Sequence, residues 1–433
     1  MKRRTKLAIA IACAVGIGLV SWSMASTLAK TDYNARGLAE YEAGNCDKAT
    51  EYFTKAIERD PKNVDAYYNR GIAYCEFFHH YDKLPQQTYI EAGLSDEEAA
   101  FQKAMTDFNQ TLELDPDYAL AYFGKGNAYY LYVDSYTDRA TKVIPEYEKA
   151  LEHEGWILDK AGVEGVAAVY TNLGRTYFAM CELDKAYENY KKALDLAPID
   201  TALEHQAPVC VELEKYTEAY ELATEYISMA EGSEEFDLAL MPGMIASYYL
   251  GKNDEAIGYG NEIIATFPDS GYVAGAHRFL ARIYTEEGND TQAREHIDAA
   301  IDMCTDITGS EEAAVIDIPG ACYERGLAYF DIGEYDRAIN DFSYLVDHPE
   351  IANREIAHEN FYLQGHIGLA CANSQVGENN EAKNILEDVL MLLDEPDFQG
   401  YKKYRRAGVE ALLNKINAGE SIPIPMMYQI IGK

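Results

Sequence analysis

One spacing of residues recurs along the chain and limits the fold more than any other feature. It is clearest in residues 167–200, where aromatic, small and proline anchors fall at Tyr170, Leu173, Gly174, Tyr177, Ala186, Tyr190, Ala193 and Pro198. Small side chains let two helices approach closely, and the aromatic side chains fill the space beside them. Proline ends the second helix because it cannot donate the helical hydrogen bond. The segment therefore predicts two antiparallel helices.

The same anchors return through most of the chain after residue 30. They lie, some with gaps, in residues 30–63, 64–118, 119–157, 200–233, 237–270, 274–307, 319–352 and 363–396. Repeats of this length stack into an array in which each unit buries the apolar face of its neighbour. The 433 residues are therefore explained by one elongated array of about nine units, rather than by two or three ordinary domains.

The unit at residues 167–200 resembles the tetratricopeptide repeat (TPR), with nearly every signature position filled. The resemblance implies an all-α fold, a right-handed α-solenoid of about nine TPR helical hairpins with a C-terminal capping helix, preceded here by an N-terminal signal or anchor segment. In such arrays the first helices of the hairpins line a concave groove. Members of the family hold a peptide or a helix of a protein partner in that groove.

The predicted organisation has six parts. Residues 1–29 form a signal peptide or signal anchor, 30–157 hold units 1–3 with an insertion near 78–98, 158–307 hold units 4–7, 308–318 form an insertion loop, 319–396 hold units 8–9, and 397–433 form the capping helix and tail. The insertions are either functional or ordinary solvated loops. The capping helix carries the basic cluster Lys402, Lys403, Arg405 and Arg406, which is either a solvated face or a contact for an acidic partner or lipid headgroup.

The first residues predict export. The basic stretch MKRRTK precedes the apolar run LAIAIACAVGIGLV and then SWSMA, which has small residues at the spacing of a cleavage site. An uncleaved anchor is the rival interpretation, because residues 7–29 carry no charge and are long enough to cross a bilayer. Lipid modification at Cys13 is a third. In each case the chain is extracytoplasmic, either membrane-anchored by an N-terminal helix or secreted or periplasmic after cleavage.

Charge and motifs exclude several function classes. The chain has 37 basic and 73 acidic side chains, a net charge of −36, whereas nucleic acids are bound mainly through phosphates by Lys and Arg. The stretch HENFY at residues 358–362 lacks the second His of a zinc helix, and no nucleophile elbow or phosphate loop is present. We therefore predict no enzyme, no cofactor, no metal and no nucleic acid. An enzyme with an unrecognised site in the insertions is the alternative.

The TPR resemblance also assigns groove-facing positions on the first helices. These are Tyr41, Tyr68, Asn127, Tyr130, Thr171, Arg175, Phe178, Arg278, Arg282, Tyr323 and Phe330. Aromatic, polar and cationic side chains suit a peptide platform, while the competing interpretation is a set of solvated helix faces. Of the positions with which chaperone-binding TPRs grip a C-terminal carboxylate, only that of Asn69 matches, so we do not expect this mode of binding.

Six cysteines are predicted to lie in neighbouring pairs once the repeats are aligned: Cys46 with Cys75, Cys181 with Cys210, and Cys304 with Cys322. An exported protein is where such pairs oxidise, and each bond would add roughly 3 to 4 kcal/mol by loop entropy. In the alternative interpretation all seven cysteines after the signal, Cys371 included, are buried small apolar residues.

Together these features predict a scaffold for protein–protein interaction. Partner peptides or helices would bind the concave groove of the TPR superhelix in an extracytoplasmic or membrane-associated complex. The alternative is a regulatory TPR domain that senses a peptide or another ligand. Membrane association would run through the N-terminal segment if it stays uncleaved, and the sequence leaves the oligomeric state open.

Overall fold

A computed structural model describes residues 32–79, 97–133, 135–229, 237–268, 270–309, 317–349 and 361–422. These residues form helices and connecting turns without a strand. The predicted signal or anchor, residues 1–29, lies outside the described residues, as do most of the insertion near 78–98 and most of the loop 308–318. Within the described ranges, no helix is both long enough and apolar enough to span a bilayer.

The described helices follow one another as nine pairs and a final single helix. The pairs are α2 (Tyr33–Glu42) with α3 (Cys46–Arg59), α4 (Val64–His79) with α6 (Glu97–Leu114), α7 (Ala119–Tyr132) with α9 (Ile144–Glu152), α10 (Glu154–Ala179) with α11 (Leu183–Leu196), α12 (Asp200–Glu212) with α13 (Tyr216–Met229), α14 (Asp237–Tyr249) with α15 (Asn253–Thr266), α16 (Val273–Glu286) with α17 (Asp290–Gly309), α18 (Asp317–Asp331) with α19 (Tyr335–Asp347), and α21 (Phe361–Gln375) with α22 (Asn379–Leu392). The final helix is α23 (Gln399–Asn417), after a short 3-10 turn, η2 (Pro396–Phe398). The short α8 (Tyr136–Asp138) and a π-helix, η1 (Arg139–Val143), precede α9.

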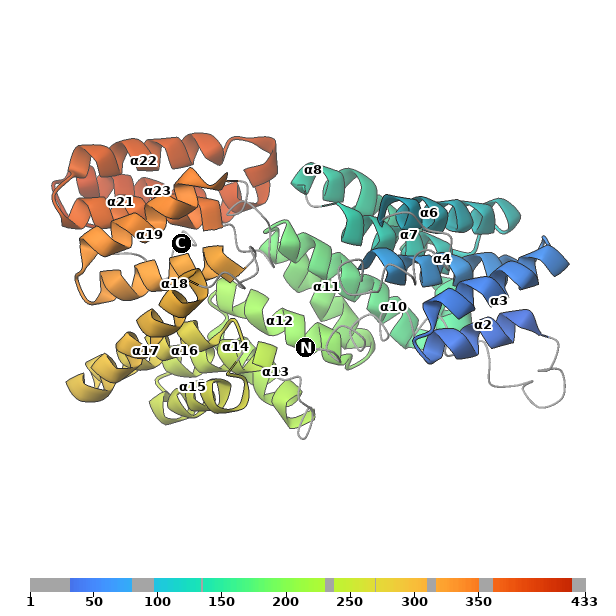
Figure 1. The fold of residues 1–433 in the computed structure, drawn as a ribbon, viewed down its shortest axis with the longest axis horizontal. Coiled ribbons are helices and arrows are strands. Elements are labelled where there is room, and N and C mark those ends of the chain that lie inside the picture. The colour runs from blue at the N-terminus through green and yellow to red at the C-terminus, as the bar shows by residue number, and fades with distance from the viewer. Residues whose placement is uncertain are drawn as a thin grey trace. The chain divides into compact units, whose positions relative to one another are not determined.

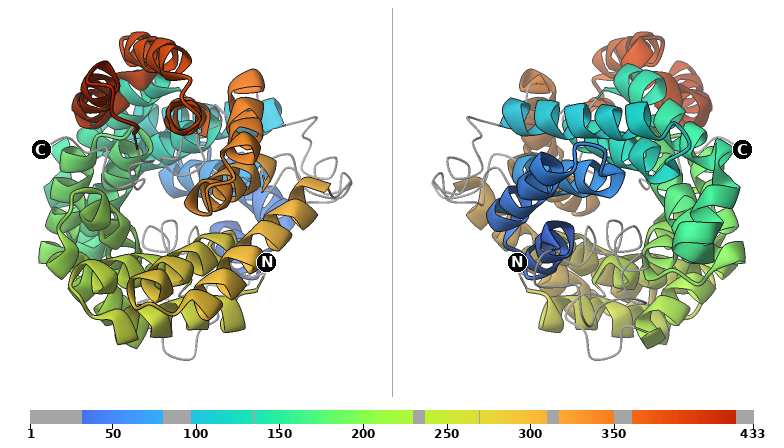
Figure 2. Two further views of the ribbon diagram at one scale, coloured as in Figure 1. Left: turned by 90° about the vertical axis from the view of Figure 1, so that its left-hand side faces the viewer. Right: turned by 90° about the vertical axis from the view of Figure 1, so that its right-hand side faces the viewer.

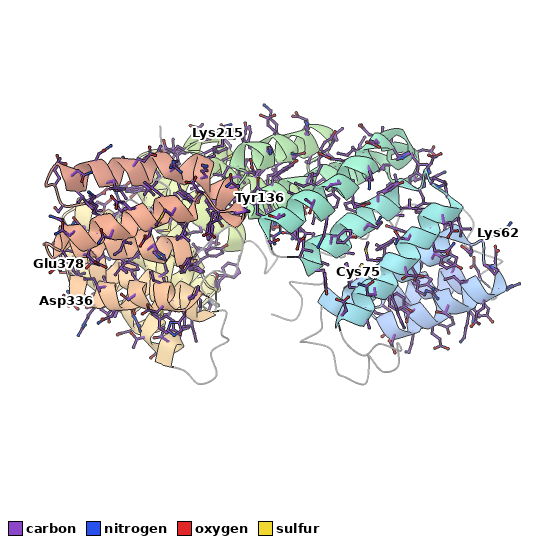
Figure 3. The ribbon with its side chains drawn as sticks, turned by 90° about the horizontal axis from the view of Figure 1, so that it is seen from above. Lys62, Cys75, Tyr136, Lys215, Asp336 and Glu378 are labelled. Carbon is purple, nitrogen blue, oxygen red and sulfur yellow. The ribbon has the colours of Figure 1, made fainter. Side chains whose placement is uncertain are left out.

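The chain divides into two compact units. Unit 1 comprises Met1–Thr176 and Glu188–Ala202, and unit 2 comprises Tyr177–Tyr187 and Leu203–Lys433. Within each unit, consecutive helices lie side by side, for example α4 with α6 and α18 with α19 (Figures 1 and 2). Asp336 and Glu378, at the starts of α19 and α22, lie at the same edge of unit 2 in Figure 3. The all-helical, TPR-like solenoid fold predicted from the repeats is thereby confirmed.

Several boundaries differ from those predicted. Helix α10 begins at Glu154, inside the range assigned to unit 3 of the repeats, and bends at Gly162, whose φ of 69° interrupts the helical backbone. Helix α17 runs to Gly309 and α18 begins at Asp317, so both described ends of the predicted loop 308–318 are helical. No anchor residue of the repeat marks the start of α10, the end of α17 or the start of α18. The repeat pattern therefore did not predict these boundaries.

A glycine opposite an aromatic ring joins the two helices in most pairs of unit 1. The contacts are Gly37 with Phe53, Gly71 with Phe108, Gly126 with Tyr147, and Gly174 with Tyr190. A Cβ atom at Gly174 would lie 2.7 Å from ring carbons of Tyr190, closer than van der Waals contact allows. In unit 2, Phe342 of α19 faces Gly326 of α18 in the same way and is fully buried. Glycine is thus required for the close approach of these helices.

An ion pair lies next to three of these rings. Arg70 of α4 makes a bidentate contact with Asp107 of α6, at 2.7 and 2.8 Å. Arg325 of α18 contacts Asp341 of α19 likewise, at 2.9 and 2.6 Å. Lys125 of α7 lies 3.3 Å from Glu146 of α9. Each of these acids immediately precedes the aromatic residue that faces a glycine, so one short segment of the second helix supplies both contacts.

The aromatic core of unit 1 extends beyond the repeat anchors. Tyr68 of α4 and Tyr118, just before α7, have ring centroids 5.3 Å apart, and Tyr118 lies 4.8 Å from the indole of Trp156 on α10. Burial raises the pKa of Tyr118 far above its ordinary range, and Asp65, whose Oδ1 accepts a hydrogen bond from the Tyr118 hydroxyl at 2.9 Å, adds to the effect. The three rings connect helices of successive pairs into one apolar cluster.

Candidate functional site

The eleven predicted groove-facing residues divide by burial. Tyr68, Thr171, Phe178 and Tyr323 are each at most 7% exposed and offer little surface to a partner, so their role in binding stays a prediction. Their rings and hydroxyls are used within the fold: Tyr323, for example, lies 5.8 Å from Phe361, and Thr171 donates to the carbonyl of Ala167. The physical reason is burial by the next repeat, as Phe361 at the start of α21, the first helix of the next pair, covers Tyr323.

In unit 1 the structure brings three of the predicted residues together. Asn127 and Tyr130 lie three positions apart on α7, and Arg175 lies on α10; all three are half-buried. The guanidinium carbon of Arg175 is 5.3 Å from the centroid of the Tyr130 ring, and that of Arg139 is 5.6 Å away. Such cation–π contacts hold an aromatic ring in place. We call Asn127, Tyr130, Arg139 and Arg175 the Tyr130 cluster.

Hydrogen bonds fix the amide of this cluster. The Oδ1 atom of Asn127 accepts from the hydroxyl of Tyr147 at 2.7 Å and from Nδ2 of Asn172 at 2.8 Å. Tyr147 also faces Gly126, so the repeat contact and the cluster share a residue. Because its acceptor is occupied twice, the orientation of Asn127 is set by the fold before any ligand arrives.

Arg139 was missed by the sequence analysis. It lies in the π-helix η1, between the two helices of the third repeat, and is 6% exposed. A π-helix inserts an extra residue and is frequently found at functional sites, but no residue anchor of the repeat predicts it. A signal in the sequence was the number of positions between Tyr129 and Tyr147, which is larger than that between the equivalent Tyr177 and Tyr190.

Nearer the N-terminus, the predicted residue Tyr41 is engaged within the fold. Its hydroxyl donates to Oε1 of Glu76 at 3.0 Å. Asn69, which matched one position of the carboxylate-binding pattern, donates through Nδ2 to Oδ1 of Asn34 at 3.2 Å and is 6% exposed. These residues connect α2 to α4.

In unit 2 the two predicted arginines are bound by acidic and phenolic groups of the chain itself. Arg278 lies 3.0 Å from Glu324 and 3.5 Å from Asp331. Burial opposes its charge, yet the two carboxylates raise the pKa of Arg278 above its ordinary value. Arg282 donates to the hydroxyl of Tyr248 at 3.1 Å and contacts Glu286 at 3.4 Å. An anionic ligand would have to compete with these groups.

Phe330 completes the predicted set. Its ring meets that of Tyr335 edge-to-face, with centroids 5.1 Å apart, and it packs against the core around Phe342. It is half-buried. Its surroundings are therefore those of a core margin.

The seven described cysteines form no disulfide in the structure. Six of them are buried and Cys46 is half-buried. Burial raises the pKa of Cys304 and that of Cys322 to about 12, each with a smaller contribution from nearby acidic groups, and the Cys322 thiol contributes to the shift at Cys304. Thiols with such pKa values are protonated at neutral pH and react slowly with oxidants. Oxidation of the three pairs stays a prediction.

Carboxylates of the chain bind the basic cluster of the capping helix α23. Lys402 lies 2.7 Å from Asp394, Lys403 contacts Asp184, and Arg406 lies 3.1 Å from Glu410. Arg405, 7% exposed, lies 3.3 Å from Glu212 of α12. Arg405 is therefore not part of a solvated helix face, and its acidic partner, Glu212, belongs to the same unit.

No group of three or more His, Cys, Asp or Glu side chains positioned for a metal ion occurs in the described ranges. His277 of α16 and His296 of α17 share a hydrogen bond, with their Nδ1 atoms 2.9 Å apart. Burial lowers the pKa of His277 to about 4, helped by repulsion from His296, and burial also lowers the pKa of His296.

Three stretches of the chain match sequence models of the tetratricopeptide repeat. They are residues 37–76, 167–200 and 319–343. The matches support the TPR resemblance, and repeats of this family generally serve in protein–protein interaction. They do not concern the N-terminal segment.

Two curated proteins contain similar stretches. The chain is 30% identical to human Tetratricopeptide repeat protein 6 over 125 residues, 25% of this chain, and 23% identical to Protein KINESIN LIGHT CHAIN-RELATED 1 of Arabidopsis thaliana over 247 residues, 56% of this chain. The matched regions span 24% and 36% of those two proteins. Among solved structures, pilF of Pseudomonas aeruginosa is 20% identical, with 56% of this chain and 94% of that chain covered and a TM-score of 0.42.

Proposed function

We propose that this chain is a non-catalytic scaffold that binds peptides or helices of protein partners on the first helices of its repeats. The Tyr130 cluster carries this proposal. It combines a half-buried aromatic ring, two guanidinium groups and an amide whose orientation is fixed by two hydrogen bonds. Tyrosine and arginine are the residue types that dominate binding energy at protein interfaces.

The chemistry of the cluster suggests what it binds. Tyr130 offers an apolar ring, and Arg175 brings positive charge to a chain whose net charge is −36. A segment with an acidic side chain next to an apolar one would gain from both, whereas a purely acidic segment would be repelled by the rest of the chain. The ligand proposed for unit 1 is therefore a short amphipathic segment with few acidic residues.

The proposal includes the cellular setting inferred from the first residues. A basic stretch followed by an apolar run supports export or anchoring, with the repeats in a right-handed solenoid outside the cytoplasm as part of a membrane-associated complex. N-terminal sequencing of the protein isolated from its native membrane or extract distinguishes the two forms. A mature chain that begins near residue 26 indicates cleavage, and one that begins at Met1 and fractionates with membranes indicates an anchor.

Affinity capture with matched variants tests the binding surface. The full chain and its Tyr130→Ala and Arg175→Ala variants serve as bait in extract of the native source, and the bound proteins are quantified by mass spectrometry. Tyr122→Ala is the control, because Tyr122 lies on the same helix with its ring stacked on His153. We expect at least one partner to fall about tenfold with Tyr130→Ala and Arg175→Ala but not with Tyr122→Ala. A partner set that all four baits share equally would disprove the role of the cluster.

A further inference from the structure

The first turn of α23 approaches two segments of unit 2 that lie far from it in sequence. Lys403 contacts Asp184, near the start of α11, and Arg405 contacts Glu212, the last residue of α12, across 193 positions. A Cβ atom at Gly400 would collide with the carbonyl group of Met180. Only glycine permits so close an approach of backbone to backbone. Three separate contacts thus hold residues 400–405, at the start of α23, against these segments.

The site that receives this turn is negatively charged for two reasons. Glu212 is 2% exposed and stands at the C-terminal end of α12, where unsatisfied carbonyl groups already give the helix a negative end. A buried carboxylate at that place requires a cation. Asp184 adds a second, more exposed charge at the neighbouring helix. A cationic helix is therefore the ligand that this chemistry selects.

The resident helix does not satisfy the site completely. One oxygen of Glu212 accepts a hydrogen bond from Arg405 at 3.3 Å, while Oε1, which is also buried, has no hydrogen-bond partner among the described residues. An arginine presented more squarely would bond to both oxygens, and such bidentate pairs are shorter and stronger. The strongly acidic chain also attracts cationic segments at long range.

The rest of α23 is secured independently of this turn. Val409, Leu412 and Ile416 are buried, and α23 packs along α22. The segment after the helix is fixed to α21, where Gln375 donates to the carbonyl of Ile422 at 2.7 Å. The first turn therefore has the means to leave Glu212 while the remainder of α23 keeps its packing.

We propose that Met180, Asp184 and Glu212 form a docking site for a cationic helix of a protein partner, and that the first turn of α23 occupies this site as a built-in competitor. The partner helix would carry a glycine with basic residues three and five positions later, the spacing of Gly400, Lys403 and Arg405. This inference rests on the proposed scaffold function and names a second site for it, in unit 2.

A peptide competition experiment tests the docking site. The probe is a fluorescein-labelled synthetic peptide with the sequence of residues 395–420, and its binding to the full chain is followed by fluorescence anisotropy. Affinity for an occupied site is reduced by the fraction of time the site is open. Arg405→Ala in the full chain should therefore strengthen probe binding about tenfold or more over the wild type. Adding Glu212→Gln to that variant should abolish the gain.

Control variants separate docking from general loss of structure. Arg406→Ala removes a neighbouring cation that bonds to Asp394 and Glu410 and not to Glu212, and it should leave probe binding at the wild-type level. Gly400→Ala opens the site by steric collision with Arg405 intact and should strengthen probe binding as Arg405→Ala does. Circular dichroism establishes that each variant is folded.

Equal probe binding by the wild type, Arg405→Ala and Gly400→Ala would overturn the proposal, as would tight binding that survives Glu212→Gln. Neither result would touch the scaffold function, because the Tyr130 cluster lies in unit 1 and is tested by capture with different variants. Conversely, loss of all partners at the Tyr130 cluster would leave the probe experiment unchanged.

Discussion

The helical pairs of this protein are joined in two different ways. In α7/α9, α10/α11 and α18/α19 a glycine on the first helix faces an aromatic ring on the second. In α14/α15 the sizes are exchanged, with Met244 on the first helix and Gly260 on the second. In α16/α17 alanine and isoleucine, Ala281 and Ile297, form the contact. In each of these pairs the contact between the two helices, here called the junction, joins one large and one small residue. The helix that carries the large residue varies, and so does the rigidity of its side chain.

The polar contact beside the junction changes as well. Asp107 and Asp341 each precede an aromatic residue and accept hydrogen bonds from an arginine of the first helix. His296 takes the equivalent place before Ile297 and bonds to His277. A charged pair therefore accompanies the aromatic junctions of Phe108 and Phe342, and a pair of histidines accompanies the aliphatic one.

The largest expected effect is the loss of an aromatic ring from a rigid junction. Phe342→Ala should cost about 4 kcal/mol of unfolding free energy, because the fully buried ring also faces Gly368 of α21 and leaves a cavity between three helices. Met244→Ala should cost about 2 kcal/mol, since neighbouring side chains close around the loss of a flexible chain. Hydrogen exchange in a denaturant series provides the measurement, on α18 to α21 for Phe342→Ala and on α14 to α16 for Met244→Ala. Equal costs would show that the two kinds of junction do not differ.

The ion pair beside the ring comes next. Arg70→Ala should cost roughly 2–3 kcal/mol, because Asp107, only 3% exposed, would lose its cation. Burial already raises the pKa of Asp107 against the opposing effect of Arg70, so the variant should raise that pKa further. Lys55→Ala is the control, since the Lys55–Glu51 pair is exposed and screened by solvent, and its loss should leave the free energy of unfolding nearly unchanged. Denaturant unfolding measures both variants, and a neutral Arg70→Ala would refute the coupling.

Alanine at three glycines isolates the rigidity of the large partner. Gly174→Ala should destabilise by roughly 2 kcal/mol, because the Tyr190 ring cannot retreat. Gly260→Ala should cost about 1 kcal/mol, since the nearest atom it meets is the terminal methyl of the flexible Met244, with two side-chain carbons of Leu280 at 3.0 Å. Gly258→Ala, on the exposed face of α15 with open space at its Cβ, should stabilise by about 0.5–1 kcal/mol. Thermal unfolding ranks the three, and a different order would contradict the comparison.

The smallest effect concerns pH. Because the folded pKa of His277 is lowered to about 4 from an ordinary value near 6.5, the unfolded chain binds more protons than the folded chain between these values. Stability of α16/α17 is therefore fully present above about pH 6.5 and is lost as pH falls toward 4. For this partly exposed pair the loss is about 1 kcal/mol. His277→Phe should remove that dependence, measured by urea unfolding at pH 7 and pH 5. If the free energy of unfolding of His277→Phe falls between pH 7 and pH 5 as much as that of the wild type, the histidine pair is not the source of the pH dependence.

The repeat anchors predicted most of the helices because they describe local spacing. Gly174 and Tyr190 are close in sequence, and their spacing directly predicts a pair of helices. The weaker units have a fainter pattern because some lack the glycine in the first helix, as in the pair of Met244 and Gly260, where the large residue is on the first helix and the small one on the second. Periodicity of size, rather than of residue type, is the signal that such units retain.

The candidate sites were less predictable. Burial of Tyr68 and Tyr323 depends on residues of the next repeat, which a position within one repeat does not report. Arg139 lies in a π-helix outside the repeat pattern, and the contact of Arg405 with Glu212 joins residues 193 positions apart. Local spacing contains no information on contacts of that range.

The aromatic chain from Tyr68 through Tyr118 to Trp156 gives unit 1 an optical label of its own. The sequence holds 35 tyrosines but two tryptophans, Trp22 and Trp156, and the first belongs to the N-terminal segment. Tyrosine excitation passes to the indole of Trp156 while neighbouring rings such as Tyr118, 4.8 Å away, stay packed around it, so indole emission follows unit 1. Unit 2, with no tryptophan of its own, emits as tyrosine. The order in which the two units melt is thus readable from the colour of the emitted light, without any added dye.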